Sequence, residues 1–288
     1  MRKEILGIHG APEPHWVGDG FHVQSLLPVP GATADTSRFL LLDYAAPEQM
    51  PPSDLPRGVG EHPHRGFETV TLLYQGELEH RDSAGNHGRL EPGDVQWMTA
   101  AAGVVHEEKF AADFARRGGV VEMVQLWVNL PRARKMDAPG YQALDRSRIP
   151  VVALDDGAGQ VRVVAGEFGS RRGPARTATP VELFEVTLEA GAELAVPIAD
   201  GHNAVVVILS GTGTVNGSAA VIGPGVVVLH PAGDEVVLKA GEATTLLVLA
   251  GAPIDEPVVS HGPFVMNTSE EIHQAVVDYR AGKMGRLD

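Results

Sequence analysis

Short apolar stretches of strand length alternate with turn residues along most of the chain. Residues 70–76 and 204–211 are two such stretches, both rich in Val and Leu and both closed by a polar residue and a glycine. Each is followed by a second short stretch and then by a Pro-Gly turn, at residues 92–93 and 224–225. Strand-length apolar runs with Gly and Pro between them are typical of all-β proteins. We therefore predict an all-β fold and not a helical bundle.

The same order of strands and turns occurs twice with similar spacing, which indicates an internal repeat. A strand, a glycine turn, a second strand and a Pro-Gly turn into a third form the local pattern of a jelly-roll (double-stranded β-helix) barrel. Residues 201–233, in the second copy, contain no Asp, Glu, Lys or Arg. Glycines and a proline break this run into short pieces, so it predicts buried sheet and not a membrane span. We expect two tandem barrels in a chain of 288 residues, which is long enough for two domains.

The segment between the two copies is polar. Residues 133–150 carry charged side chains around Pro139 and Gly140, which predicts an interdomain linker. The predicted division is an N-terminal domain at residues 1–132 and a C-terminal domain at residues 151–288.

The end of the second domain predicts a short C-terminal α-helix. Thr268 and Glu271 have the spacing of a capping box. Apolar residues follow at helical spacing, at Ile272, Ala275, Val276 and Tyr279. We expect this apolar stripe to pack on a barrel.

Composition narrows the class of protein. The formal net charge is −14 and no block of Lys or Arg is present, so direct binding of nucleic acid is not expected. The chain has no cysteine, which excludes disulfides, thiolate nucleophiles and iron–sulfur clusters. The first residues lack the apolar core of a signal peptide, so we expect a cytoplasmic protein with no membrane partner.

Two separated pairs of residues predict a metal site. His62 and His64 alternate in one segment, and His106 and Glu108 alternate in a later one. Side chains two apart on a strand share a face, so each pair can converge, while Glu107 points away. Three imidazoles and a carboxylate form a mixed shell that suits Fe(II), Mn(II), Ni(II), Cu(II) or Zn(II). By the same alternation Glu68 shares the face of His62 and His64, so it competes with Glu108 as the metal carboxylate.

The second copy of the repeat lacks these ligands. Aligned on the turns, it has no His-x-His before Gly211 and no His/Glu pair after Gly225. Its His202 and His230 fall at other positions, where we expect solvated or loop histidines. We predict one metal ion per chain.

Several motifs resemble the pirin family of bicupins. They are His-Pro-His-Arg-Gly-Phe-Glu-Thr-Val at residues 62–70, Gly-Asp-Val-Gln-Trp-Met-Thr-Ala at 93–100 and Gly-Val-Val-His-Glu-Glu at 103–108, with further matches at 15–21, 126–130 and 261–268. The resemblance covers nearly the whole chain and is weakest at about 151–256. It implies two cupin barrels in tandem, with one iron in the N-terminal barrel held by His62, His64, His106 and Glu108, and it favours Glu108 over Glu68.

The resemblance also implies a function. Members of the family are described as quercetin 2,3-dioxygenases, which open a flavonol with O2 and release carbon monoxide. The partners would then be a small aromatic substrate and O2. The substrate hydroxyl must lose a proton, and Glu108 is the candidate catalytic base. Two alternatives stay open at this point: a redox-sensing metal protein that binds and regulates a protein partner, and another cupin enzyme acting on a small acid or sugar.

The neighbours of the predicted site have simpler interpretations. Phe67, Trp97, Met98 and Trp127 are expected in the barrel core rather than in a substrate pocket. Arg65 is expected to form an ion pair outside the ligand face. Residues 82–88 predict a turn, with His80 and His87 facing solvent.

Overall fold

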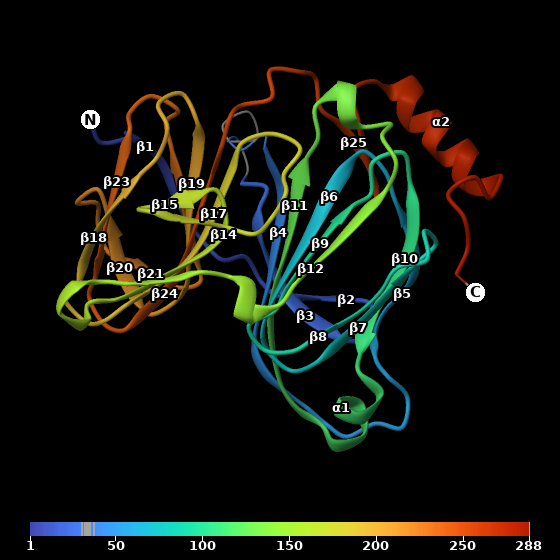
Figure 1. Cartoon of the computed structure of the whole chain (residues 1–288), viewed down its shortest axis with the longest axis horizontal. Coiled ribbons are helices and arrows are strands. Elements are labelled where there is room, and N and C mark those ends of the chain that lie inside the picture. The colour runs from blue at the N-terminus through green and yellow to red at the C-terminus, as the bar shows by residue number, and fades with distance from the viewer. Residues whose placement is uncertain (30, 32–35, 37, 288) are drawn as a thin grey trace. The chain divides into compact units, whose positions relative to one another are not determined.

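The computed structural model describes residues 1–29, 31, 36 and 38–287. Most of its regular elements are strands, and the chain forms two compact units (Figure 1). The N-terminal unit comprises Glu13–Gln24, Leu41–Arg146 and Ile254–Asp288, and the C-terminal unit comprises Met1–Pro12, Ser25–Leu40 and Ser147–Pro253. The predicted all-β class is confirmed.

The N-terminal unit contains a seven-stranded and a four-stranded sheet. The seven-stranded sheet has the order β12 (Gly140–Leu144), β9 (Val95–Thr99), β6 (Phe67–Gln75), β11 (Gly119–Asn129), β4 (Phe39–Met50), β3 (Phe21–Leu27) and β2 (His15–Val17). The four-stranded sheet has the order β5 (Gly58–His64), β10 (Val104–Phe110), β7 (Leu78–Asp82) and β8 (His87–Leu90). A short helix, α1 (Ala112–Arg117), follows β10.

The C-terminal unit repeats this combination of sheets. Its seven-stranded sheet has the order β1 (Ile5–Gly10), β22 (Gly225–Leu229), β19 (Asn203–Ser210), β24 (Thr244–Gly251), β17 (Val181–Leu188), β14 (Gly159–Ala165) and β13 (Val151–Ala153). Its four-stranded sheet has the order β18 (Glu193–Pro197), β23 (Glu235–Ala240), β20 (Thr212–Val215) and β21 (Val221–Ile222). The short elements β15 (Glu167–Phe168), β16 (Arg171–Arg172), η2 (Arg146–Arg148) and η3 (Asp155–Gly157) lie outside these sheets.

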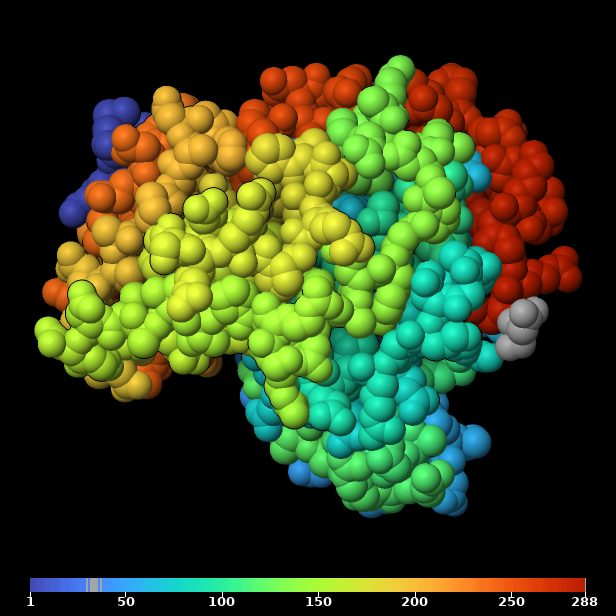
Figure 2. Space-filling model, viewed as in Figure 1, coloured from blue at the N-terminus to red at the C-terminus, as the bar shows by residue number. Residues whose placement is uncertain are grey.

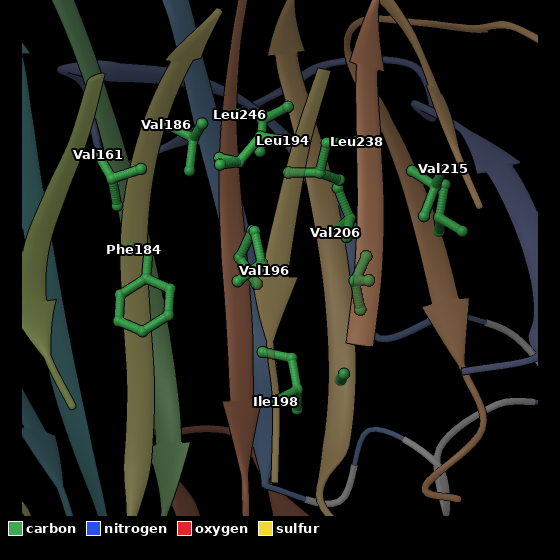
Figure 3. Packing of buried hydrophobic residues seen from close by; sticks show 14 of the residues in the cluster. Val161, Phe184, Val186, Leu194, Val196, Ile198, Val206, Val215, Leu238 and Leu246 are labelled. Carbon is green, nitrogen blue, oxygen red and sulfur yellow. The ribbon is translucent and has the colours of Figure 1, made fainter. Parts of the chain in front are cut away.

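The interior of the C-terminal unit is filled with aliphatic side chains. Val186 and Val206 of one sheet face Leu194, Val196 and Leu238 of the other in one buried cluster (Figure 3). These last three occupy the inner side of β18 and β23. In the N-terminal unit the equivalent outer pair of strands, β5 and β10, carries the histidines instead.

Each end of the chain belongs to a different unit from the one predicted: residues 1–12 to the C-terminal unit and residues 254–288 to the N-terminal unit. Strand β1 pairs with β22 and so belongs to the C-terminal unit. Strands β25 (Val259–His261) and β26 (Phe264–Met266) and helix α2 (Ser269–Arg280) belong to the N-terminal unit. The compact units therefore differ from the division at residues 132 and 151, because sheet pairing and packing between residues distant in sequence decide where each terminal segment lies.

The predicted linker also contributes to the fold. Residues 140–144 form strand β12, which pairs with β9 at the edge of the seven-stranded sheet. Just before it, the single turn η1 (Arg132–Arg134) leads to Lys135, whose side chain is 1% exposed. The polar composition of this segment concealed both its edge strand and its buried lysine.

The predicted C-terminal helix is confirmed. Thr268 is its N-cap, and Thr268 and Glu271 form both hydrogen bonds of a capping box. Ile272 and Ala275 are buried against Val105 and Phe264 of the N-terminal unit. The helix lies on the outside of this unit, in red in Figures 1 and 2. None of the described helices is long and apolar enough to span a membrane.

Candidate metal centre

Three histidines converge on the inner side of the four-stranded sheet of the N-terminal unit. Strands β5 and β10 are antiparallel neighbours, with His62 opposite His106 and His64 opposite Val104. The ring centroids of His62 and His106 are 4.2 Å apart, and those of His64 and His106 are 4.9 Å apart. The three side chains offer nitrogen atoms that all lie within 4.8 Å of one another. Alternation within each strand and the pairing of β5 with β10 together bring the three histidines close to one another.

Backbone carbonyls determine which nitrogen of His62 and His64 faces the centre. A carbonyl oxygen only accepts hydrogen bonds, so His62 Nδ1 donates to Gly60 O at 2.7 Å and His64 Nδ1 donates to Pro263 O at 3.4 Å. In neutral rings this leaves both Nε2 atoms unprotonated, and they lie 3.1 Å apart. Two cis nitrogens on an octahedral ion, with bonds of about 2.1 Å, would lie about 3.0 Å apart. The pair therefore has the spacing of two adjacent ligands.

A β-bulge provides the acceptor for His62. His106 pairs with His62 and Glu108 pairs with Val59, so β5 has one more residue than β10 between these pairs. The extra residue bends the strand and frees the Gly60 carbonyl for the imidazole.

The third histidine is fully buried and has one nitrogen without a partner. His106 is 0% exposed, and its Nε2 has no hydrogen-bond partner among the described residues. Burial, and then the neighbouring imidazoles of His64 and His62, lower the pKa of His106 well below the usual value. Burial and His62 likewise lower the pKa of His64. Neutral imidazoles bind metals, and a buried polar atom without a partner is rare, so these residues fit a cation.

Glu108 lies beside His106 in a polar pocket of its own. Gln96 Nε2 donates to its Oε1 at 2.8 Å, and Gln125 Nε2 donates to its Oε2 at 2.9 Å. The Thr71 hydroxyl is 2.7 Å from Gln125 Oε1 and 3.1 Å from Glu108 Oε1, and its single hydrogen can serve one of them. A carboxylate has about four acceptor positions, so two amide donors leave room for a cation.

A second group of candidate ligands contains Glu108. Atoms of His80, His106 and Glu108 also lie within 4.8 Å of one another, and all three residues are buried. Glu68 belongs to neither group among the described residues. Glu107 points outward, where it forms ion pairs with Arg81 and Lys109.

The alternation used to place Glu68 does not continue past Gly66. Strand β5 ends at His64 and β6 begins at Phe67, with Gly66 between them at φ 91°. A Cβ on Gly66 would lie 1.9 Å from the carbonyl oxygen of Val265, so only glycine fits this turn. The face of β6 that carries Phe67, Thr69 and Thr71 is therefore the one directed at the site.

Glu68 lies on the other face of β6. It is 2% exposed and accepts a hydrogen bond from the Thr99 hydroxyl at 2.6 Å. The expectation that Glu68 shares a face with His62 and His64 is wrong, because the turn at Gly66 resets the alternation.

The aromatic neighbours divide between the two faces. Phe67, Trp97 and Met98 are buried, as expected for core residues. Phe67 nevertheless lies on the site side: the His64 ring is 5.0 Å from Phe67 and 5.1 Å from Trp127, and these two aromatic rings stack at 4.3 Å. They form an aromatic wall beside His64.

Arg65 forms a buried ion pair away from the ligands. Its guanidinium donates to Asp278 of α2 at 2.9 Å and to the carbonyl of Ala102 at 2.6 Å. Residues beyond β5 continue alongside the C-terminal segment, since Arg65 N donates to Pro263 O and Val265 N donates to Arg65 O. Helix α2 and the hairpin of β25 and β26 before it therefore hold the chain just after β5 in place.

His80 is the residue that the sequence interpretation missed. It is 3% exposed and not solvent-facing, while His87 is exposed as expected. His80 lies on β7 between Leu78 and Asp82, and all three residues are buried. In a strand, His80 shares a face with the apolar Leu78 two residues before it, and this was the signal that the sequence offered.

A groove of about 1090 Å³ runs over the four-stranded sheet. It is lined by residues that include Leu55, Gly60, His80, Arg81 and Lys109. Its lining contains His80 but none of the four predicted ligands. The groove thus lies next to the centre and does not identify the place where a substrate would meet the ligands.

Among the residues that the structure describes, neither of the two histidines singled out in the C-terminal unit belongs to a group of candidate ligands. His230 is exposed and accepts a hydrogen bond from Ala232 N, and partly buried His202 is 3.7 Å from Glu182. The absence of a metal in this unit stays a prediction.

Two family models match the chain in separate regions. The model described as "Pirin" matches residues 20–128, and the model described as "Pirin C-terminal cupin domain" matches residues 183–285. The two matches correspond to the two copies of the sequence repeat.

Individual proteins are similar over nearly the full chain. A Pseudomonas aeruginosa protein named "Putative quercetin 2,3-dioxygenase" is 50% identical over 99% of both chains, and the pirin of Mus musculus is 40% identical over 80% of this chain and 79% of its own. A solved structure of a quercetin 2,3-dioxygenase from Acinetobacter baumannii is 46% identical, covers 100% of both chains and superposes with a TM-score of 0.97. The fold is therefore that of two cupin domains in tandem, and the chain belongs to the pirin family.

Proposed function

We propose that the protein is a metal-dependent dioxygenase that opens quercetin or a related flavonol with O2. One divalent ion, Fe(II), is held by His62, His64, His106 and Glu108. The observation that carries the proposal is the converging set of three imidazoles with a buried carboxylate next to them. The similar proteins from P. aeruginosa and A. baumannii that bear the name quercetin 2,3-dioxygenase support the choice of reaction and substrate.

The ion supplies a binding place for an anionic oxygen and the redox capacity for O2. Three neutral imidazoles and one carboxylate leave a divalent ion with a residual positive charge, which favours a deprotonated flavonol over the neutral molecule. His62 and His64 keep their Nε2 atoms directed at the centre because Gly60 and Pro263 hold their Nδ1 atoms. Gln96 and Gln125 hold Glu108 in the same way.

Glu108 is also the proposed base. Its carboxylate is the acidic group beside the histidines, and it would accept the proton from the 3-hydroxyl of the flavonol. The stacked rings of Phe67 and Trp127 provide a flat apolar surface next to His64, which suits an aromatic substrate.

The test is aerobic turnover of quercetin by the Fe(II)-reconstituted protein. Loss of the flavonol absorbance, O2 uptake and released carbon monoxide should occur together in equal amounts. The His106→Ala variant and the metal-free protein should show none of these three changes. His230→Ala is the matched control, because His230 is an exposed histidine in the other unit, and it should retain full activity.

If the Fe(II)-loaded protein consumes no O2 and leaves quercetin intact, the dioxygenase function is wrong. The metal centre would then be better explained by the other function expected for the family, a redox-sensitive protein that binds a partner.

A further inference from the structure

We propose that His80 is a positioning residue for the metal centre: backed by the carboxylate of Asp82, it accepts a hydrogen bond from Nδ1 of His106 and so keeps Nε2 of His106 unprotonated. The inference concerns metal binding by the proposed centre. It does not depend on flavonol chemistry, so it can be tested whether or not quercetin is turned over.

Hydrogen-bond donors surround the carboxylate of Asp82, which favours its charged form. Oδ1 accepts from the backbone N–H groups of Ala84 and Asn86, and both oxygens accept from the Asn86 side chain. Oδ2 lies 3.3 Å from His80 Nε2. A carboxylate has no hydrogen to give, so His80 Nε2 is the donor in this contact.

The proton on Nε2 determines the other nitrogen of His80. In a neutral imidazole with Nε2 protonated, Nδ1 is an acceptor. His80 Nδ1 lies 3.5 Å from His106 Nδ1, and both rings are buried. Two acceptors facing each other would repel, so His106 Nδ1 carries the proton and donates.

The position of this proton also determines the state of the other nitrogen of His106. With its proton on Nδ1, His106 has a free lone pair on Nε2, the buried atom without a partner among the described residues. All three histidines then present Nε2 to the centre. Their Nδ1 protons go to Gly60 O, Pro263 O and His80 respectively. The tautomer of a metal-binding histidine is commonly set in this way by a partner on the opposite nitrogen.

The surroundings keep the His80 ring in place. It stacks on Tyr141 with centroids 4.9 Å apart and an angle of 20° between the planes. Tyr141 donates its hydroxyl hydrogen to Gln96 Oε1 at 3.0 Å, and Gln96 donates to Glu108. A Cβ on Gly88 would lie 1.8 Å from the Tyr141 hydroxyl, so a glycine is required where this tyrosine packs. His80 therefore contacts His106 directly and is connected to Glu108 through Tyr141 and Gln96.

Three substitutions separate a hydrogen-bond acceptor from a packing residue. His80→Leu keeps a similar volume but has no acceptor. His80→Asn keeps an oxygen close to the position of Nδ1. Asp82→Asn has the shape of aspartate but offers an N–H to His80 Nε2, which would move the His80 proton to Nδ1 and set two donors against each other.

The measurement is the affinity for Zn(II), obtained by titration against a chelator, with thermal unfolding of the metal-free proteins as a check of folding. We expect His80→Leu and Asp82→Asn to lower the affinity about 10–100-fold, the usual effect of losing an outer partner of a ligand. His80→Asn should restore most of it. In the His80→Asn background, Asp82→Asn should have no further effect, because the acceptor no longer depends on the carboxylate.

A second readout reports the tautomer directly. Two-dimensional ¹H–¹⁵N NMR of the imidazoles should show His106 protonated at Nδ1 in the Zn(II)-loaded protein, with His80 protonated at Nε2. In the metal-free Asp82→Asn variant, His80 should instead be protonated at Nδ1.

Two results would overturn the inference. Equal losses of affinity in His80→Leu and His80→Asn, with a Zn(II)-bound His80 nitrogen in the spectrum, would make His80 a ligand, consistent with the grouping of His80, His106 and Glu108. Unchanged affinity in His80→Leu and Asp82→Asn would show that the contact between the two rings has no influence on the centre.

Discussion

Exchanging each candidate carboxylate for its amide tests the composition of the metal centre. Glu108→Gln preserves shape but removes the negative charge beside His106. Both oxygens of Glu108 now accept from side-chain amides, Gln96 at 2.8 Å and Gln125 at 2.9 Å. The new amide group must turn its NH2 toward one of these donors. Unless a neighbouring amide also turns, the new NH2 group then faces the NH2 group of Gln96 or Gln125 in a buried place, whichever way the new side chain is oriented.

The hydroxyls of Thr71 and Tyr141 can relieve this conflict, because a hydroxyl both donates and accepts. If the amide of Gln125 turns, its NH2 faces the Thr71 hydroxyl, which can accept this hydrogen bond and donate its own hydrogen to Oε1 of residue 108, 3.1 Å away. If the amide of Gln96 turns instead, the Tyr141 hydroxyl accepts from it and its own hydrogen loses its present acceptor. One buried polar group left without a partner costs about 1–3 kcal/mol, so the metal-free variant should lose less stability than that.

The effect on metal affinity should be larger than that of changing an outer group. Losing an outer partner typically lowers affinity about 10–100-fold, and Glu108 is proposed to contact the ion itself. We expect a loss above about 100-fold for Glu108→Gln, which corresponds to more than about 2.7 kcal/mol of binding free energy. Competition with a chelator of known affinity, using Zn(II) and Fe(II) separately, measures it.

Glu68→Gln is the matched control. Glu68 is also buried, but it lies on the opposite face of β6 and accepts from the Thr99 hydroxyl, a bond that an amide oxygen can keep. Its affinity should stay close to that of the unchanged protein. If Glu68→Gln empties the centre while Glu108→Gln retains the ion, the assignment of Glu108 is wrong and the general cupin pattern holds.

Two further predictions concern stoichiometry and pH. Elemental analysis should find one transition-metal ion per chain. The variants His62→Ala, His64→Ala and His106→Ala should each lose most of the metal, whereas His202→Ala should keep it. Two tightly held ions per chain would contradict the prediction that the C-terminal unit binds no metal. Burial lowers the pKa of Lys135 from 10.5 to about 8, although Nζ donates to Gly66 O, Val265 O and Asn129 Oδ1. The pKa of Lys135 is lower in the folded than in the unfolded protein, so the buried charge lowers the free energy of unfolding below about pH 8. This cost is relieved as the pH rises toward 10.5. Over that interval the free energy of unfolding of the wild type should rise by up to about 3 kcal/mol relative to Lys135→Met. Denaturant titrations at pH 7, 8, 9 and 10 check this, and a constant difference between the two proteins would show that Lys135 keeps an ordinary pKa.

Periodicity was sufficient where the strand was regular. His62 and His64 lie in one strand and His106 and Glu108 in another, so alternation alone placed each pair on one face. It failed at Gly66, where a positive φ ends one strand and the next begins with the alternation reset. A glycine is visible in a sequence, but the close approach of Val265 that requires it is not.

The division into compact units depended on contacts that no local pattern contains. The apolar residues of β1 have strand character, yet nothing near them in sequence shows that β22 is their partner. The capping box predicted α2 correctly because its hydrogen bonds are formed within four consecutive residues. It carried no information about which unit the helix would join.

The partners of the three histidines differ in the same way. Gly60 lies two residues from His62, so a local bulge supplies the first acceptor. His80 lies on a strand next to that of His106, and its burial could have been read from the alternation of β7. Pro263 is 199 residues from His64 and reaches it only because the C-terminal segment runs beside Arg65. Short motifs are therefore enough to predict the candidate ligands, whereas the orientation of each imidazole, on which the proposed metal binding would depend, comes from progressively more distant parts of the chain.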